Sequence, residues 1–442
     1  MEVIKSAFSK LGKKFNKGYE FYLSIYLVIN VIWIFLGMFF YNYSKFGYQN
    51  YSTGHVFFLI FNVLVIFILN IFKKVKFDKI DVFLILLGVF GFISFLFAEN
   101  SSVALYGYYL RFEGLLQLLY YYSLMYLSSL VFKDKYKNLV TDFILVFGLI
   151  NAFICLIQVF DILKFIPINH RGVRHGLGLI THSNFYGSYM VLCMGLSLGK
   201  FLYFDKKYSW IYMILFLIFY SSMLVCNTLS AVVGLGFICL FIFIYFVYNL
   251  IKKNKINFVK YIIIFLLTVL VSICIVNCGK TGLVRDVKKL SNETKEVAKG
   301  NFDDSYGTSR MFIWKNTLRI VPNYLLHGVG IDNFCFAFGD GEKMLYHETS
   351  KAVTYVDKAH NEYLQKLVCE GVFSVITYIS MLFIIFISSL KRIFKDGNCV
   401  VMVLFLPFVG YCIQAFFNIS VIEVAPIFWI VCGLLYKKKC KI

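Results

Sequence analysis

His360 is the residue whose type and position most directly suggest chemistry. It lies in the segment AHNEYL at 359–364, which leads into a long apolar run. On a helix, His360, Leu364 and Leu367 share one face, because positions i, i+4 and i+7 align. An imidazole with an ordinary pKa of about 6.5 accepts a proton at neutral pH. The segment therefore predicts a general base at the head of a helix; the alternative is a solvated histidine at the membrane surface.

Two neighbours of His360 each have two interpretations. Glu370 could orient the imidazole or be an ordinary helix carboxylate, and the sequence leaves both open. Asn361 could contact substrate or cap the entering helix. Asparagine is a preferred N-cap residue, so we expect Asn361 to be the cap.

Arginine is rare in this chain and unevenly placed. Six of the seven arginines, and all seven histidines, fall on the side of the membrane that the topology below predicts to be outside. Lysine is sufficient to set topology, whereas the guanidinium group is a planar fork matched to phosphate oxygens. The uneven placement therefore indicates phosphate chemistry on the outer side. The six are Arg111, Arg171, Arg174, Arg285, Arg310 and Arg319.

The elements that must position these residues are membrane-spanning helices. Of the 442 residues, 60% are hydrophobic, above the range of about 45–50% for soluble domains. The excess forms uncharged runs of about 18–25 residues, long enough to cross a bilayer as helices. We predict an all-α, polytopic integral membrane protein with about twelve spans. They begin near Phe21, Val56, Val82, Leu115, Leu139, Ser183, Ser209, Ala231, Tyr261, Val372, Cys399 and Val424.

The charge pattern predicts orientation and excludes one class of function. The net charge is +20, but the lysines cluster between alternate spans, as expected for cytoplasmic loops. Both termini are therefore predicted to be cytoplasmic. No nucleic-acid recognition motif accompanies the charge, so we expect no nucleic-acid partner. The cysteines fall mostly inside spans and form no CxxC pattern, so no metal or redox site is expected.

One segment interrupts the pattern of spans. Residues 279–361 are mostly polar and lie between the ninth and tenth spans, which places them outside as one large loop within a single membrane domain, 1–442. A loop this long without function is uncommon. We expect a charged helix at 288–299 and a second helix with Arg310 and Trp314 on one side.

Four blocks of the sequence, in order, resemble the signature of the O-antigen ligase and polymerase family, the membrane glycosyltransferases of bacterial surface polysaccharides. Together they extend from about 106 to 371, and twelve spans with one large outer loop before the tenth also match. The blocks are YG to RFEGL at 106–115, SNFYGSY at 183–189, Ser309-Arg310 through Trp314-Lys315 to GVGIDNF at 328–334, and His360-Asn361 with Gly371.

The chain departs from the family pattern at two places. Thr228-Leu229-Ser230 stands where many members have T-x-S-R, but Ala231 replaces the arginine. If that arginine holds the donor phosphate, another residue must do so here, or the donor differs. Ser374 replaces Gly, Thr or Tyr at the end of the histidine signature, which is a milder change.

The resemblance implies a GT-C-like enzyme of the bacterial cytoplasmic (inner) membrane that needs no metal or cofactor. It would transfer a glycan from an undecaprenyl-diphosphate carrier to an acceptor hydroxyl on the outer face, with inversion. His360 would take the acceptor proton, with Glu370 as a further catalytic candidate. Arg310, in a motif block on the outer loop, would stabilise the leaving diphosphate, and Arg174, Arg111 and Arg319 are the further candidates.

The partners implied are the carrier-linked glycan, a glycan or lipid-linked acceptor, membrane lipids, and a chain-length regulator or other polysaccharide-assembly membrane protein. A transporter or flippase of lipid-linked oligosaccharides is the alternative function. A transporter should place charged residues within its spans, whereas most spans here lack them, which favours the enzyme. Polymerase and ligase are not distinguished, because both use the same donor chemistry.

Overall fold

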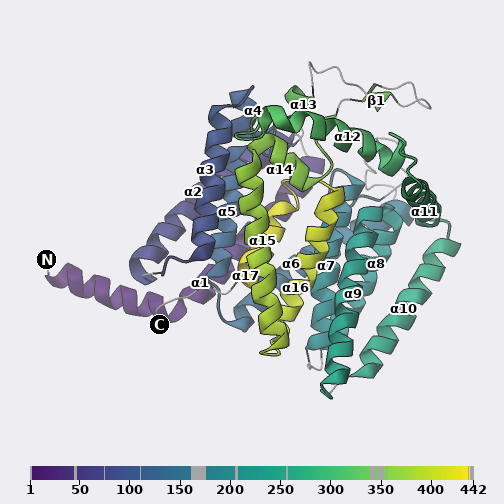
Figure 1. Cartoon of the computed structure of the whole chain (residues 1–442). Helices are drawn as coiled ribbons and strands as arrows, with labels where there is room; N and C mark the ends of the chain where they lie inside the picture. The colour runs from purple at the N-terminus through teal and green to yellow at the C-terminus, as the bar shows by residue number, and fades with distance from the viewer. Residues whose placement is uncertain are drawn as a thin grey trace.

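The computed structural model describes residues 2–43, 47–73, 75–109, 111–160, 176–204, 208–254, 257–338, 345–346, 353–354, 356–436 and 438. This part of the chain is helical apart from one two-stranded antiparallel pair, in which Leu345 pairs with Thr354. Figure 1 shows a bundle of long helices with short helices across one end, which we call the loop end.

The long helices run in alternating directions along the bundle, and α5 and α17 are the two shortest of these passes. The twelve are α1 (Glu2–Tyr43), α2 (Gly47–Lys73), α3 (Lys79–Leu96), α5 (Leu115–Ser129), α6 (Asp134–Phe160), α7 (Ser183–Tyr203), α8 (Ser209–Cys226), α9 (Leu229–Ile251), α10 (Phe258–Asn277), α15 (Val372–Phe394), α16 (Cys399–Gln414) and α17 (Ala425–Leu435).

The remaining elements are short or lie in the connections. They are α4 (Ser101–Tyr106), α11 (Leu283–Ala298), α12 (Tyr306–Ile320), the 3₁₀ turn η1 (Val321–Tyr324), α13 (Phe334–Ala337), β1 (Leu345–Tyr346), β2 (Val353–Thr354), α14 (Glu362–Glu370) and the 3₁₀ turn η2 (Ala415–Phe417).

Ten of the described helices are long and apolar enough to cross a membrane. The spans predicted near Leu115 and Val424 correspond to α5 and α17, with 15 and 11 residues. At 1.5 Å per residue these are about 22 and 16 Å long, shorter than a hydrocarbon core of about 30 Å. Both are mostly buried among other helices, so their apolar sequences serve protein packing. The described chain is a polytopic, helical membrane protein, as predicted.

The centre of the bundle is α7, whose membrane-spanning segment is fully buried. Small residues let α16 approach it closely, as is usual for helices packed in lipid. A Cβ at Gly195 would lie 2.6 Å from the backbone nitrogen of Pro407. At the other extreme, α10 stands at the edge of the bundle (Figure 1) and only 11% of its segment is buried.

At the loop end, α14 carries the residues that follow His360. Asn361 caps it as predicted, because its Oδ1 accepts hydrogen bonds from the backbone nitrogens of Tyr363 (3.0 Å) and Leu364 (3.1 Å). Gly371 ends α14 with φ +84°, and a Cβ there would lie 2.5 Å from the carbonyl oxygen of Leu326. A glycine is therefore required where α14 turns into the span α15.

The two helices expected within 279–361 are both present. The charged one, α11, begins five residues earlier than predicted, and α12 contains Arg310 and Trp314. A small apolar core, separate from the main one, joins this region to α14. Its buried members include Ile313, Val329 and Val368.

Candidate functional site

His360 is held in a strained backbone conformation between two anchors. Its φ is +49°, in the left-handed region, which costs a residue other than glycine about 1–2 kcal/mol. On one side, the indole nitrogen of Trp314 donates to the carbonyl oxygen of Ala359 (3.1 Å). On the other side, Asn361 caps α14. The backbone on either side of His360 is thus fixed from α12 and from α14.

Two guanidinium groups lie close enough to His360 to change its ionisation. Burial, followed by the positive charges of Arg310, Arg111 and the neighbouring His182, lowers the pKa of His360 to about 4, although Asp357 acts in the opposite sense. The imidazole is therefore neutral at pH 7. Among the predicted site residues, the structure brings Arg310, Arg111 and His360 together.

Arg310 is positioned by a left-handed turn at the start of α12. Gly307, Thr308 and Ser309 have φ of 63°, 60° and 65°. This turn directs the carbonyl oxygen of Gly307 and the hydroxyl of Thr308 back to one guanidinium nitrogen, at 2.9 and 2.7 Å. The other terminal nitrogen donates to the carbonyl oxygen of Phe417 (3.0 Å). The Nε of Arg310 is buried and has no partner among the described residues. Arg310 therefore has one buried N–H donor left for a ligand.

Arg111 connects the RFEGL block to the segment before His360. Its Nε is 2.6 Å from Oδ2 of Asp357, and its guanidinium lies 5.4 Å from the centre of the Phe185 ring. Burial raises the pKa of Asp357, but the charge and hydrogen bond of Arg111 outweigh it and hold that pKa below its ordinary value. All four sequence blocks thus contribute to one site, the SNFYGSY block through Phe185.

The sequence did not single out His182 as a site residue. It is the N-cap of α7, where its Nδ1 accepts a hydrogen bond from the backbone nitrogen of Asn184 (3.2 Å). Burial and then the charges of Arg111 and Arg310 lower its pKa. Its place directly before the SNFYGSY block is the signal that could have identified it.

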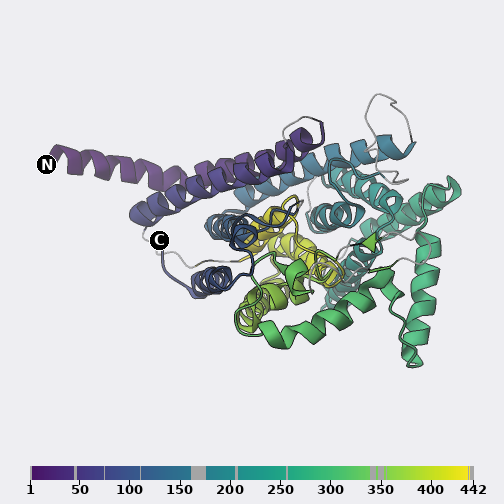
Figure 2. The same ribbon diagram turned by 90° about the horizontal axis from the view of Figure 1, so that it is seen from above.

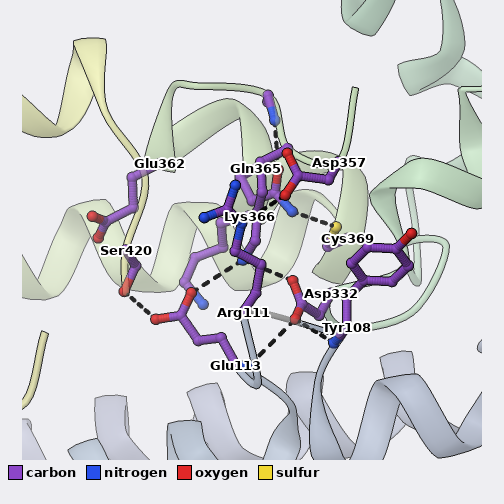
Figure 3. Close-up of polar contacts among 12 residues, drawn as sticks. Tyr108, Arg111, Glu113, Asp332, Asp357, Glu362, Gln365, Lys366, Cys369 and Ser420 are labelled. Atoms are coloured by element: carbon purple, nitrogen blue, oxygen red, sulfur yellow. Dashed lines mark hydrogen bonds and ion pairs between the residues drawn. The ribbon is translucent and has the colours of Figure 1, made fainter. Parts of the chain in front are cut away.

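Lys358 forms a buried ion-pair cluster that sequence reasoning also missed. Its ammonium nitrogen lies 2.7 Å from Asp332 and 3.2 Å from Glu113. The other oxygen of Asp332 accepts from the backbone nitrogens of Tyr108 (2.7 Å) and Glu113 (3.3 Å). Figure 3 shows these carboxylates facing one another across the cluster, with Ser420 donating to Glu113. Burial opposes the charged form of Lys358, but Asp332 and Glu113 raise its pKa above the ordinary value.

The described contacts of Glu370 are not with the imidazole. Both its carboxylate oxygens are bound by Lys366, at 2.6 and 2.7 Å, and Ser374 donates to one of them (2.8 Å). Glu370 ends the nine-residue helix that begins beside His360, which separates them by about 12 Å along the helix axis. These contacts fit the alternative in which Glu370 is a helix carboxylate.

A cavity of about 50 Å³ lies beside the ion pair of Lys366 and Glu370. These two residues and Glu113 form part of its lining. Glu362 also lines it and accepts hydrogen bonds from the hydroxyls of Tyr378 (2.7 Å) and Tyr411 (3.2 Å). Burial raises the pKa of Glu362 to about 7. Glu113, Glu362, Lys366 and Glu370 thus meet at one small cavity.

Of the other arginines predicted for the site, the structure describes only Arg319, which is not part of this arrangement. Arg319 is exposed, nine residues after Arg310 on α12, and its guanidinium is 3.5 Å from Oδ1 of Asn316. Arg174 lies outside the described residues. At Ala231, where the family pattern has arginine, the side chain is buried against the start of α7 near Gly187. Among the residues that the structure describes, the guanidinium groups that act on His360 come from Arg111 and Arg310.

Backbone strain gathers in the same region. Seven residues other than glycine have positive φ in the described chain, and five of these belong to or adjoin the site: Phe112, Thr308, Ser309, Asp332 and His360. Such strain persists only where the surrounding structure enforces it, and it is common at active sites. Among the described residues, no group of three or more His, Cys, Asp or Glu side chains is placed to hold a metal ion.

The comparison with protein families matches part of the chain. The family model described as O-Antigen ligase matches residues 213–379. This segment contains the Arg310 and His360 blocks and leaves out those at 106–115 and 183–189. A search of curated proteins finds no match.

Proposed function

From the match of residues 213–379 to the family model described as O-Antigen ligase, we propose that the chain is a membrane glycosyltransferase of this family that transfers a glycan from an undecaprenyl-diphosphate carrier to an acceptor hydroxyl. The reaction takes place at the loop end, on the outer side of a bacterial cytoplasmic membrane. Polymerisation of repeat units and ligation of finished glycan both use this chemistry.

The observation that carries the proposal is the neutral imidazole of His360 beside the guanidinium groups of Arg310 and Arg111. A neutral imidazole can accept the proton of a hydroxyl. Guanidinium groups in a site of low dielectric stabilise negative charge that develops on phosphate oxygens. A base beside two such cations is what displacement of a diphosphate by a hydroxyl requires.

The proposed transfer needs only the donor, the acceptor, His360 and the arginines to account for every proton and electron pair. The acceptor oxygen attacks the anomeric carbon as its proton passes to His360, and the bond from that carbon to the diphosphate oxygen breaks with its electron pair. The diphosphate leaves from the opposite face, so the configuration inverts. Arg310 donates to the departing oxygens through Nε, the buried donor without a partner among the described residues.

Donor binding also adjusts the base. The charges of Arg310 and Arg111 lower the pKa of His360 to about 4 in the free protein, which leaves a weak base. A bound diphosphate would offset these charges and raise the pKa toward neutrality, where general-base catalysis is most effective. His360 would thus become a stronger base once the donor is bound.

The test compares His360→Ala with the wild type in cells that lack the native gene, with glycans resolved by size and by carrier linkage. We expect the variant to lower transfer by about 10²–10⁴-fold at equal protein level. Accumulated single carrier-linked repeats indicate a polymerase, and full-length polymer left on the carrier indicates a ligase.

Two outcomes would contradict the proposal. One is normal glycan from His360→Ala. The other is carrier-linked glycan retained on the inner leaflet of the deletion strain, which is the expectation for a flippase.

A further inference from the structure

The helix α11 is amphipathic along its full length. Leu283, Val287, Leu290 and Val297 recur at i, i+4, i+7 and i+14 and form one apolar stripe. The opposite face is charged. The segment 280–299 contains six basic and three acidic residues, namely Lys280, Arg285, Lys288, Lys289, Lys295, Lys299, Asp286, Glu293 and Glu296.

The protein itself leaves much of the apolar stripe uncovered. Val287 is 47% exposed and Leu290 is 37% exposed, and the adjacent Val284 is 48% exposed. A soluble loop helix would bury such a stripe against the domain. The charged face, in contrast, needs water or anionic groups, so the helix fits a boundary between an apolar and a polar phase.

The position of α11 matches such a boundary. It is seen along its axis at the right of Figure 1 and lengthwise in Figure 2, so it lies across the direction of the spans. Five residues separate it from the end of α10, a span with little protein cover, whose Val276 is 44% exposed. The apolar stripe therefore continues the lipid-facing surface of the bundle at the loop end.

Two contacts connect α11 to the rest of the loop end. At its start, Oδ1 of Asn227 accepts from the hydroxyl of Thr281 (2.9 Å) and the backbone nitrogen of Gly282 (2.5 Å). Further along, Oε2 of Glu293 accepts from the backbone nitrogen of Gly307 (3.0 Å). Gly307 is the first residue of the left-handed turn that presents Arg310.

We propose that α11 lies in the headgroup region of the leaflet at the loop end, with its apolar stripe among acyl chains and its lysines on anionic phospholipids. Through Glu293, the seated helix then supports the turn that holds Arg310. The contact of α11 with the membrane does not depend on the proposed function. The importance of the turn at 307–309 for catalysis rests on the proposed function.

The membrane contact is tested with the full-length protein in vesicles of phosphatidylglycerol and phosphatidylcholine. Val287→Trp places a fluorophore on the apolar stripe, and Asn292→Trp is the matched control on the charged face. Emission is measured as the difference from the wild type, with lipids brominated near the headgroup and with acrylamide in the water.

We expect lipid bromine to quench Trp at 287 at least about threefold more than Trp at 292, with acrylamide giving the reverse order. Equal acrylamide quenching at both positions would show that α11 stands in water and would overturn the proposal. Equal lipid quenching of Trp at 287 with and without phosphatidylglycerol would overturn the part that concerns anionic lipid.

The link to Arg310 is tested by hydrogen exchange, which does not depend on enzymatic turnover. Glu293→Ala removes the acceptor of the Gly307 amide, and Glu296→Ala is the control, because Glu296 binds Lys299 and Asn301 instead. We expect exchange at 305–311 to rise about tenfold or more in Glu293→Ala only. An equal response of the two variants would exclude the link, and activity would remain available as a separate test of function.

Discussion

Asp357 and Lys358 stand just before His360, and both are bound to the distant stretch of chain at 111–113. Asp357 pairs with Arg111, and Lys358 pairs with Glu113 and Asp332. The Lys358 pairs are buried and the Arg111–Asp357 pair is partly buried; such pairs cost desolvation, so their value for overall stability is small. Their effect is to fix the chain on which His360 is placed, because neither partner can be left alone in a buried site.

Removal of Lys358 should therefore be costly. Lys358→Met leaves the carboxylates of Glu113 and Asp332 buried without a cation, and we expect a loss of about 3–5 kcal/mol in the free energy of unfolding. Thermal unfolding in detergent measures it. The control is Lys315→Met, which breaks an exposed pair with Asp304 and should cost less than about 1 kcal/mol. Equal effects would mean that the cluster does not fix this segment.

The arginines make a second prediction at this scale. Arg310→Ala should lower kcat by about 10²–10³-fold, and Arg310→Lys should recover only part of it, since an ammonium group lacks the planar fork. Arg319→Ala, on the exposed side of the same helix, should stay within about twofold. Transfer assayed with purified enzyme and carrier-linked donor gives these values. A large effect of Arg319→Ala with none at Arg310 would reverse the assignment.

The pH dependence follows from the lowered pKa of His360, which is about 4 in the free protein. The imidazole is then the active, neutral base at every pH above that value, so kcat/KM should fall only as the pH approaches 4. Arg111→Gln removes one of the charges that lower this pKa, and the fall should move to higher pH. A profile of kcat/KM from pH 4 to 8 measures both. An unchanged profile in the variant would show that Arg111 does not act on His360.

At the scale of the elements, Gly371 has the strictest requirement. Gly371→Ala would place a Cβ 2.5 Å from the carbonyl oxygen of Leu326 at a φ of +84°, so we expect a loss of about 1–3 kcal/mol. Gly236→Ala is the control, because nothing lies within 4 Å of its Cβ position in α9, and it should stabilise by about 0.5–1 kcal/mol. Thermal unfolding distinguishes them. A neutral Gly371→Ala would mean that the junction of α14 and α15 has room to relax.

Local patterns predicted the helices well and their partners poorly. The cap at Asn361, the helix carrying Arg310 and the long spans follow from composition and periodicity, which act over a few residues. The pairing of Arg111 with Asp357 joins residues 246 positions apart, and no local signal carries it. The sequence could not distinguish Lys358 from the many other lysines. It also could not show that α5 and α17 are short helices buried in the bundle, because their burial depends on neighbouring helices.

At the scale of the whole molecule, buried lysines lie at both ends of the bundle: Lys358 and Lys366 at the loop end, and Lys200 and Lys260 at the opposite end. Lys200 pairs with Asp142 (2.5 Å), and Lys260 donates to the carbonyl oxygens of Phe201 (2.8 Å) and Phe204 (3.0 Å). Positive charge is typical of the cytoplasmic side. Because buried lysines lie at both ends, the proposal that the loop end, with His360, faces outward rests on the lysine tracts between alternate spans in the sequence.

Two native cysteines can test this orientation. Cys278 is exposed just after α10 at the loop end, and Cys399 is exposed at the start of α16 at the other end. A membrane-impermeant maleimide should label Cys278 in intact cells, and Cys399 only after permeabilisation, with the labelled peptides identified by mass spectrometry. Labelling in the opposite order would invert the topology and exclude the proposed reaction outside.

The stretch at 415–420 has a consequence for the order in which the protein becomes active. The carbonyl oxygen of Phe417 accepts from Arg310, and the hydroxyl of Ser420 donates to Glu113. These residues follow all other members of the site along the chain, so a ribosome makes them last. The earlier spans can enter the bilayer before Phe417 and Ser420 have been added to the proposed site. If the proposed function is right, glycan transfer cannot begin during insertion, because Phe417 and Ser420 reach the site only when the last part of the chain has been made.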